Sequence, residues 1–164
     1  ESAGGNLAAV VCLLARSLGG PAPVHQLLVY PVTNNNLDTP SYREHADAKP
    51  LNRAMMRWFL AHYVGDQPWA GSHACAFPLH AHDHKRLPPA TIVTADIDPL
   101  RSDGEQYAAA LKAAAVPVRY FNYPGVTHEF FGMGAVVPDA KKAVADAAAG
   151  LNASFGRKAP AGAE

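Results

Sequence analysis

Residues 90–122 read ATIVTADIDPLRSDGEQYAAALKAAAVPVRYFN, and this stretch decides the fold class. The apolar, β-branched run at 90–95 predicts a strand, the alanine-rich run at 103–115 predicts a helix, and the run at 117–122 predicts a second strand. A strand, a helix and a strand joined by short links form a βαβ unit, in which the two strands are parallel. The sequence therefore predicts an α/β protein.

Ser102 and Glu105 lie at the predicted start of the helix inside this unit. Their spacing matches a capping box, S-x-x-E, in which the two side chains bond backbone N–H groups around the first turn. We therefore expect Ser102 to be the N-cap residue and the helix to begin at residue 103.

The flanking sequence predicts further elements of both kinds. Helical spacing of apolar residues predicts a helix over 3–18, and the β-rich run at 24–31 predicts a central strand that ends at Pro31. Residues 139–151 predict a closing amphipathic helix. The expected apolar stripe of this helix consists of Val144, Ala147, Ala148 and Leu151.

A long irregular segment, about 34–87, separates the strand at 24–31 from the strand at 90–95. Segments of this length inside a domain are usually functional, so we expect a lid-like region that contains one helix at 51–63. One face of that helix carries Met55, Met56, Phe59, Leu60 and Tyr63. Core packing is the favoured interpretation of this stripe, and one wall of an acyl pocket is the alternative. The aromatic residues that would make such a pocket apolar are Trp58, Phe59, Tyr63 and Trp69.

Composition excludes few function classes but gives no sign of a charged partner. The 164-residue chain has no net charge, because 14 Lys and Arg balance 14 Asp and Glu. We therefore expect no nucleic acid and no membrane as partner, and no apolar run reaches the roughly 18 residues of a membrane span. Two cysteines, Cys12 and Cys75, do not make a disulfide framework. We expect a cytoplasmic protein in which Cys12 is a buried apolar residue.

The start of the chain, ESAGGNL at residues 1–7, has the character of a nucleophile elbow. In the pattern G-x-S-x-G, a sharp turn from a strand into a helix pushes a serine Oγ out of the sheet. Ser2 is the candidate nucleophile, and the small residues Ala3 and Gly4 would let the turn close. At the N-terminus of a helix, the backbone N–H of Ala3 would be an oxyanion donor.

A serine nucleophile needs a base and an acid that orients the base, and both have candidates here. Asp98 and His128 each follow a predicted parallel strand, in the chain order Ser, Asp, His that such folds use. The carboxyl ends of parallel strands lie at one edge of a sheet, where ligands bind. Asp96 competes with Asp98, but Asp98 precedes Pro99 in a turn and is the preferred acid. Only His128 follows the last predicted strand.

These motifs resemble those of α/β-hydrolases of the hormone-sensitive-lipase-like group, which are bacterial carboxylesterases and acetyl-hydrolases. The family motifs G-D-S-A-G-G, D-P-L-R-D-E-G and H-G-F are similar to ESAGGNL, DPLRSDGEQYA and YPGVTHEFFGM in this chain. The resemblance extends over about residues 1–150 and implies that Ser2 is the nucleophile, His128 the general base and Asp98 the orienting acid. Glu129 departs from the pattern, because the family has Gly after the histidine.

The resemblance also implies that this chain corresponds to the C-terminal half of the family's domain. The other half supplies the first strands, part of the lid and an H-G-G-G loop with further oxyanion N–H groups, and no HGGG occurs here. We therefore expect residues 1–152 to form a partial α/β-hydrolase fold, a parallel sheet remnant flanked by helices, with 153–164 as a flexible tail. Loss of one oxyanion donor typically slows turnover about 10²–10³-fold, so low activity is expected.

The function predicted from these residues is hydrolysis of short-to-medium acyl esters through an acyl-enzyme, with no cofactor and no metal. The alternatives that remain open are a non-catalytic α/β module, a thioesterase, a lactonase and a peptidase. A zinc site at His80, His82 and His84 is a less favoured alternative, because alternate residues of an extended segment face the same side. The expected partner is a small ester, and the sequence leaves open a homo-oligomer of the full-length protein.

Overall fold

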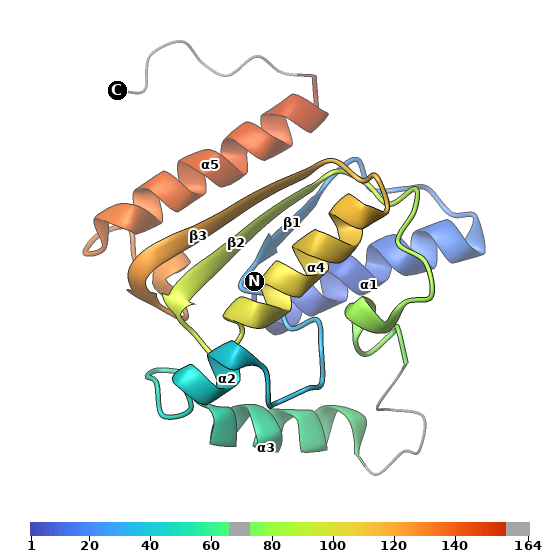
Figure 1. Cartoon of the computed structure of the whole chain (residues 1–164). Helices are drawn as coiled ribbons and strands as arrows, with labels where there is room; N and C mark the ends of the chain where they lie inside the picture. Colours follow the sequence, from blue (N-terminus) through green and yellow to red (C-terminus); the bar gives the residue numbers. More distant parts are fainter. Residues whose placement is uncertain (66–72, 157–164) are drawn as a thin grey trace.

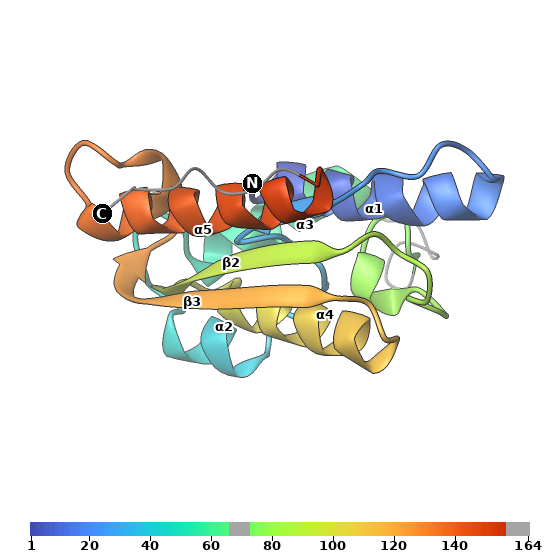
Figure 2. The same ribbon diagram turned by 90° about the horizontal axis from the view of Figure 1, so that it is seen from above.

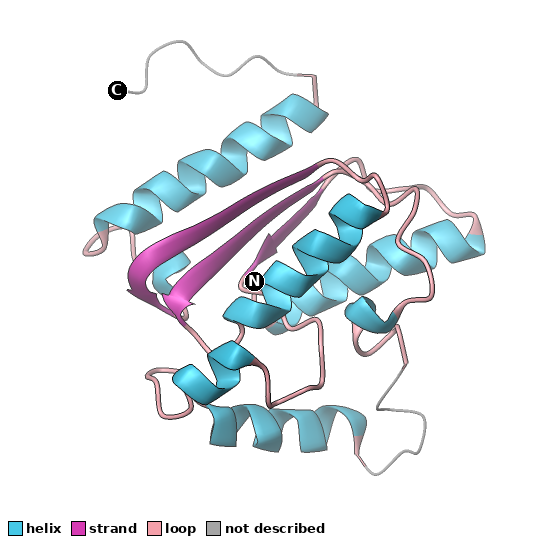
Figure 3. Cartoon of the chain, viewed as in Figure 1, coloured by secondary structure: helices cyan, strands magenta, loops and turns pink. Residues whose placement is uncertain are grey.

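A computed structural model describes residues 1–65 and 73–156 of the chain. Its centre is a parallel sheet of three strands, β1 (Gln26–Val29), β2 (Ala90–Ile97) and β3 (Val118–Thr127), in the order β1-β2-β3 (Figures 1 and 3). The βαβ prediction is confirmed, since α4 (Arg101–Ala113) connects the parallel strands β2 and β3. Trp69, one of the aromatic residues predicted to make a pocket in the lid-like segment apolar, lies outside the described residues.

Helices cover both faces of this sheet. Helix α5 (Pro138–Ser154) lies on one side, and α1 (Ala3–Leu18) and α4 lie on the other (Figure 1), while Figure 2 shows α4 and α5 on opposite sides of β2 and β3. Successive strand residues alternate between the faces. Leu28 and Ile92 therefore pack in one core with α1 and α4, and Val29 and Val93 pack in a second core with α5.

Helix α4 begins earlier than the capping box predicted. It starts at Arg101, with Leu100 as the N-cap residue, so the assignment of Ser102 as N-cap is wrong. The turn after β2 already starts the helix, because Asp98 Oδ1 accepts a hydrogen bond from the Leu100 N–H at 2.8 Å. The Ser102 hydroxyl instead accepts from the backbone N–H of Ser41 at 3.2 Å, which ties α4 to the segment between β1 and β2.

Helix α5 is longer than predicted, and its buried face shares only Ala147 with the predicted stripe. It extends over Pro138–Ser154, so residues 153 and 154 belong to the helix, and residues 157–164 of the predicted tail lie outside the described part. Its buried face consists of Ala140, Ala143, Ala147 and Gly150. Val144 of the predicted stripe is 47% exposed. Small residues are buried because α5 lies close to the sheet: a Cβ on Gly150 would lie 2.0 Å from Thr91 Oγ1.

His25 joins the end of α5 to the sheet. Its Nδ1 lies 2.8 Å from Ser154 Oγ, and its Nε2 lies 3.0 Å from Thr91 Oγ1. A neutral imidazole can accept from one hydroxyl and donate to the other, whereas the protonated ring can only donate. The arrangement therefore suits the neutral ring.

We expect acid to weaken the contacts of His25 with Ser154 and Thr91. Burial and the Arg119 guanidinium lower the pKa of His25 from its ordinary value of 6.5. The unfolded chain then binds the proton more tightly, so the stabilisation is complete above about pH 6.5 and is lost as the pH falls through the lowered pKa. Urea unfolding at pH 7.5 and 5.5 should show a smaller acid-induced loss of unfolding free energy for His25→Gln than for the unsubstituted chain. Equal losses in the two proteins would contradict this assignment.

The segment between β1 and β2 contains helix α2 (Pro40–Glu44), helix α3 (Arg53–Val64) and the 3₁₀ helix η1 (Pro78–His80). The favoured core-packing interpretation of the stripe on α3 is wrong for most of its members. Only Met56 is buried among the residues of α3, whereas Phe59 is 44% and Tyr63 is 51% exposed. Most of the apolar face of α3 is therefore exposed and does not pack in a core. None of the helices formed by residues 1–65 and 73–156 is long and apolar enough to cross a membrane.

Candidate active site

Ser2 occupies the turn into α1 in a strained backbone conformation. Its φ of 48° and ψ of −119° place a non-glycine residue outside the well-populated regions. Hydrogen bonds hold the turn: the Ser2 N–H donates to the Val29 carbonyl at 2.8 Å, and its own carbonyl accepts from the Asn6 N–H at 3.0 Å. This is the geometry that a nucleophile elbow requires, and strain of this kind is concentrated at functional sites.

The glycine that makes this turn possible is Gly5. A Cβ on Gly5 would lie 3.0 Å from Pro31 Cβ, whereas a Cβ on Gly4 would meet no atom within 4 Å. We expected the small residues Ala3 and Gly4 to let the turn close, but the close approach lies at Gly5, one residue after Gly4. Gly5 lets the first turn of α1 pack against the chain as it leaves β1.

The structure brings the three residues predicted from the sequence into one chain of contacts. Asp98 Oδ2 lies 2.7 Å from His128 Nδ1, and His128 Nε2 lies 3.1 Å from Ser2 Oγ. Asp98 is fully buried and His128 is 5% exposed. An imidazole held between a buried carboxylate and a hydroxyl is the arrangement in which a histidine can accept the serine proton.

Asp98 rather than Asp96 faces the histidine. Asp98 divides its oxygens between His128 and the Leu100 N–H. Asp96 Oδ1 accepts from the Arg101 guanidinium at 3.0 Å, and its Oδ2 accepts from the Gly125 N–H at 3.2 Å. The bond from the Gly125 N–H and the nearby Arg101 guanidinium lower the pKa of Asp96, and the two bonds tie the end of β2 to β3 and to the start of α4. The two carboxylates at the end of β2 therefore have different tasks.

The N-terminus of α1 lies beside Ser2 and offers donors for a negative charge. Ala3 is the first residue of the helix, and the first N–H groups of any helix have no partner inside it. The helix dipole adds a partial positive charge at this end. The backbone N–H of Ala3, which the sequence predicted as an oxyanion donor, therefore belongs to the helix end next to the Ser2 hydroxyl.

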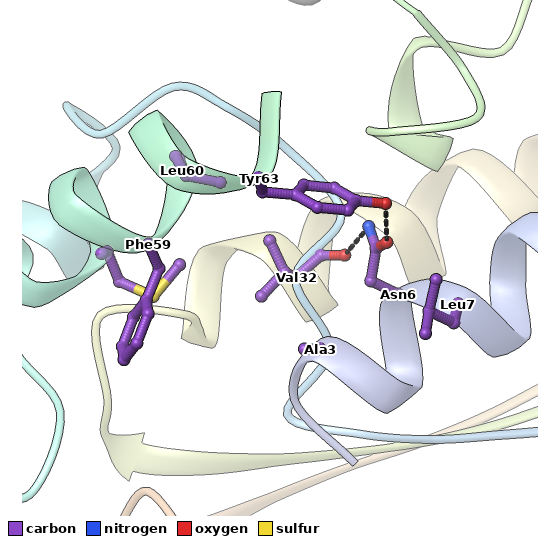
Figure 4. Close-up of a pocket in the computed structure, with 8 residues that line it drawn as sticks. Ala3, Asn6, Leu7, Val32, Phe59, Leu60 and Tyr63 are labelled. Carbon is purple, nitrogen blue, oxygen red and sulfur yellow. Dashed lines mark hydrogen bonds between the residues drawn. The ribbon is translucent and has the colours of Figure 1, made fainter. Parts of the chain in front are cut away.

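An apolar pocket of about 120 Å³ begins at Ala3 (Figure 4). Figure 4 shows α1 on one side of the pocket and the side chains of α3 on the other. The lining residues are Ala3, Asn6, Leu7, Val32, Met56, Phe59, Leu60 and Tyr63. Four of them come from the apolar face of α3, so the alternative interpretation of that face, a pocket wall, agrees with the structure.

Asn6 holds the walls of this pocket together. Its side-chain amide donates to the Val32 and Ala76 carbonyls, both at 2.8 Å, and its oxygen accepts from the Tyr63 hydroxyl at 3.4 Å (Figure 4). Asn6 is only 3% exposed. Asn6 was not predicted from the sequence, although a polar residue on the buried side of an apolar helix was the available signal.

Asp103 is a second buried polar residue whose contacts were not predicted from the sequence. It is fully buried in α4, and its Oδ2 accepts from the backbone N–H groups of Thr33 at 2.9 Å and Asn34 at 3.0 Å. Burial raises the pKa of Asp103 to about 7. This carboxyl group fixes the chain that follows Val32 and so supports the pocket wall.

Tyr30 contacts the histidine and was also missed. Its ring centroid lies 4.3 Å from that of His128, and its hydroxyl donates to Glu1 Oε2 at 2.8 Å. Burial and this hydrogen bond hold the pKa of Tyr30 well above its usual range, so the phenol keeps its proton. A tyrosine directly before a proline at a strand end carried no signal that distinguished it from a core residue.

The three histidines of the alternative zinc site do not converge. His80 Nε2 lies 3.0 Å from Asn35 Oδ1, and His84 Nε2 donates to the Pro78 carbonyl at 2.9 Å. In the described part of the chain, no three His, Cys, Asp or Glu side chains are grouped so that they could hold a metal ion. The zinc alternative therefore gains no support.

Comparisons with known proteins identify the family of this chain. A family model described as alpha/beta hydrolase fold matches residues 1–132. The carboxylesterase NlhH of Mycobacterium tuberculosis is 43% identical over 153 residues, which are 92% of this chain and 48% of that protein. The esterase LipI of the same organism is 41% identical over 143 residues, 87% of this chain and 45% of LipI. The chain thus spans about half the length of these curated relatives.

Solved structures give the same result. The structure titled DphMB1 has a TM-score of 0.87 at 40% identity and covers 93% of this chain and 50% of its own. A thermostable esterase from Pseudomonas putida ECU1011 has a TM-score of 0.84 at 39% identity, with 96% of this chain and 50% of that chain covered. The fold of this chain therefore corresponds to about half of each solved chain.

Proposed function

We propose that this chain, which belongs to the α/β-hydrolase family, carries the catalytic residues of a serine carboxylesterase that acts on short-to-medium acyl esters. The observation that carries the proposal is the contact chain from Asp98 through His128 to Ser2, at 2.7 and 3.1 Å. The printed names of the relatives, carboxylesterase and esterase, support the same reaction class.

The proposed reaction has two halves. His128 Nε2 takes the proton of Ser2 as Oγ attacks the ester carbonyl, and Asp98 holds the imidazole through Nδ1. Collapse of the tetrahedral intermediate breaks the bond to the alcohol, which leaves with the proton from His128, and an acyl-Ser2 ester remains. Water then gives a proton to His128 and attacks that ester, which releases the acid and restores Ser2.

The charge that develops on the carbonyl oxygen is placed at the N-terminus of α1, where the Ala3 N–H is the proposed donor. Preorganised donors of this type are usually the largest single contribution to such catalysis. Among residues 1–65 and 73–156, the N-terminus of α1 is the donor group that we assign to this oxygen. Because one donor group stabilises the oxyanion less than several would, we expect the chain 1–164 to form the acyl-enzyme slowly.

The proposed acyl site is the apolar pocket that starts at Ala3. Met56, Phe59 and Leu60 line it with apolar side chains, and apolar contact with the acyl chain is what such a lining favours. The lid-like segment, in this proposal, is the part of the chain that brings α3 over the elbow. This arrangement supports esters with an acyl chain that can fill the pocket.

A series of p-nitrophenyl esters from acetate to laurate tests the substrate class. Each ester is mixed with excess chain, and the acylated protein is read by intact mass after an acid quench. We expect an acyl adduct that forms fastest with butyrate to octanoate and is absent in Ser2→Ala. A matched thioester and a lactone measure the competing reactions. Equal adduct formation in Ser2→Ala, or a preference for the thioester or lactone, would contradict the carboxylesterase assignment.

A further inference from the structure

The imidazole of His128 is held at its two nitrogens, and two such contacts leave one movement free. Bonds at 2.7 Å to Asp98 and 3.1 Å to Ser2 fix the ends of the ring but still allow the ring to rock about the line that joins them. A third contact, on a ring face, is needed to stop that movement. The residue that provides this contact in the structure is Tyr30.

Tyr30 is suited to this task because it cannot move easily itself. It is 1% exposed, and its backbone N–H donates to the Val93 carbonyl at 2.6 Å. Its φ of 34° is unusual for a bulky residue, and such conformations persist only where the surroundings enforce them. Phe130 packs against its ring at a centroid distance of 6.2 Å.

The far end of the Tyr30 side chain is bonded to the residue before the candidate nucleophile. The hydroxyl donates to Glu1 Oε2 at 2.8 Å, and the peptide bond that follows Glu1 leads directly to Ser2. One side chain therefore contacts both the histidine and the turn that carries the serine. Movement of one relative to the other would break either the ring contact or the hydrogen bond.

We propose that Tyr30 is a positioning residue that fixes the plane of the His128 imidazole relative to Ser2, an inference that rests on the proposed function. The ring centroids are 4.3 Å apart and the planes are tilted by 49°, so the aromatic ring covers one face of the imidazole and excludes water from it. When His128 carries the serine proton, the same ring face attracts the resulting cation. Tyr30 thus acts through His128 and makes no contact with the substrate in this scheme.

The test replaces the ring while it leaves the three residues of the contact chain in place. Tyr30→Leu removes the ring face, and Tyr30→Phe keeps the ring but removes the bond to Glu1. The first readout is the rate at which a fluorophosphonate labels Ser2. The second is the NMR signal of the His128 Nδ1–H proton, which reports the bond to Asp98 and needs no catalysis.

We expect Tyr30→Leu to slow labelling at least tenfold and to lose the Nδ1–H signal through exchange with water. Tyr30→Phe should keep the signal and most of the labelling rate of the unsubstituted chain. The matched control is Tyr123→Leu, which removes a tyrosine that is 3% exposed, contacts Phe130 and donates to Asp146. Because this ring makes no contact with His128, the control should label within threefold of the unsubstituted chain.

The proposal is overturned if Tyr30→Leu labels as fast as the unsubstituted chain with the signal intact, or if Tyr123→Leu slows labelling as much. It is also overturned if Tyr30→Phe loses as much as Tyr30→Leu, because the ring face would then not be the cause. Should Tyr30→Leu fail to unfold cooperatively, Tyr30→Met replaces it with the same expectation. If no form labels Ser2, the proposed function fails, and the NMR signal alone still decides whether Tyr30 holds the imidazole.

Discussion

Replacing Asp98 by Asn is expected to slow fluorophosphonate labelling of Ser2 by about 10³–10⁴-fold while the fold is kept. The reason lies in how Asp98 uses its two oxygens. The Leu100 N–H needs an oxygen at the Oδ1 position, so the amide nitrogen of the asparagine must face His128 Nδ1. That nitrogen donates, so Nδ1 must be the unprotonated nitrogen. Nε2 then carries the proton and cannot accept the one on Ser2.

Asp96→Asn is the matched control for this substitution. Asp96 lies two residues earlier and bonds Arg101 and the Gly125 N–H instead of His128. Its replacement should change the labelling rate by less than about threefold, in line with a residue away from the reacting atoms. The rates are compared after both variants are shown to unfold at the same urea concentration as the unsubstituted chain. A slow Asp96→Asn together with a fast Asp98→Asn would reverse the assignment of the two carboxylates.

Replacing Asn6 by Ala is expected to lower the free energy of unfolding by about 2–4 kcal/mol, because each unpaired buried carbonyl costs about 1–3 kcal/mol. The two carbonyls are those of Val32 and Ala76, which each accept from the Asn6 amide at 2.8 Å. Urea unfolding followed by circular dichroism measures the change from the shift of the midpoint.

Asn36→Ala is the control for Asn6. The Asn36 side chain accepts from the Asp38 N–H at 2.9 Å in an exposed loop, so water can replace the lost bond. We expect its loss of unfolding free energy to stay below about 1 kcal/mol. Similar losses for the two variants would show that the bonds of Asn6 do not stabilise the fold as the structure indicates.

The positions of Ser2, Asp98 and His128 could be anticipated because each follows from chain order. Parallel strands end at the same edge of a sheet, so residues directly after two such strands must come close together. The serine turn joins them because α1 packs beside the same strands. The contact chain among the three residues was therefore within reach of the sequence, whereas their catalytic roles stay predictions until they are measured.

The partner of the apolar stripe on α3 could not be predicted from the spacing of its residues. Helical spacing of Met56, Phe59 and Tyr63 predicts which side chains share a face, but it does not say what that face contacts. A core and a pocket wall have the same apolar pattern. Only the fold decides between them, because it places α3 opposite Ala3 and leaves a space between the two.

The start of α4 and the contact of Tyr30 with His128 were missed for a related reason. Ser102 fits a local capping rule, but a partner far away in the chain, Ser41, competes for its hydroxyl. Tyr30 acquires its significance from His128, which lies about a hundred positions further along the chain. Local rules identify candidates, and contacts between distant segments decide which of them matter.

The most direct test of the central claim, that Ser2 is a nucleophile activated by His128, is the mass of the chain after treatment with a fluorophosphonate, which reacts only with an activated serine. The treated protein is digested, and any adduct is mapped to its peptide. We predict one adduct for each chain, located on Ser2 and absent in both Ser2→Ala and His128→Ala. A folded chain that stays unlabelled at Ser2, or that labels equally well after His128→Ala, would contradict it.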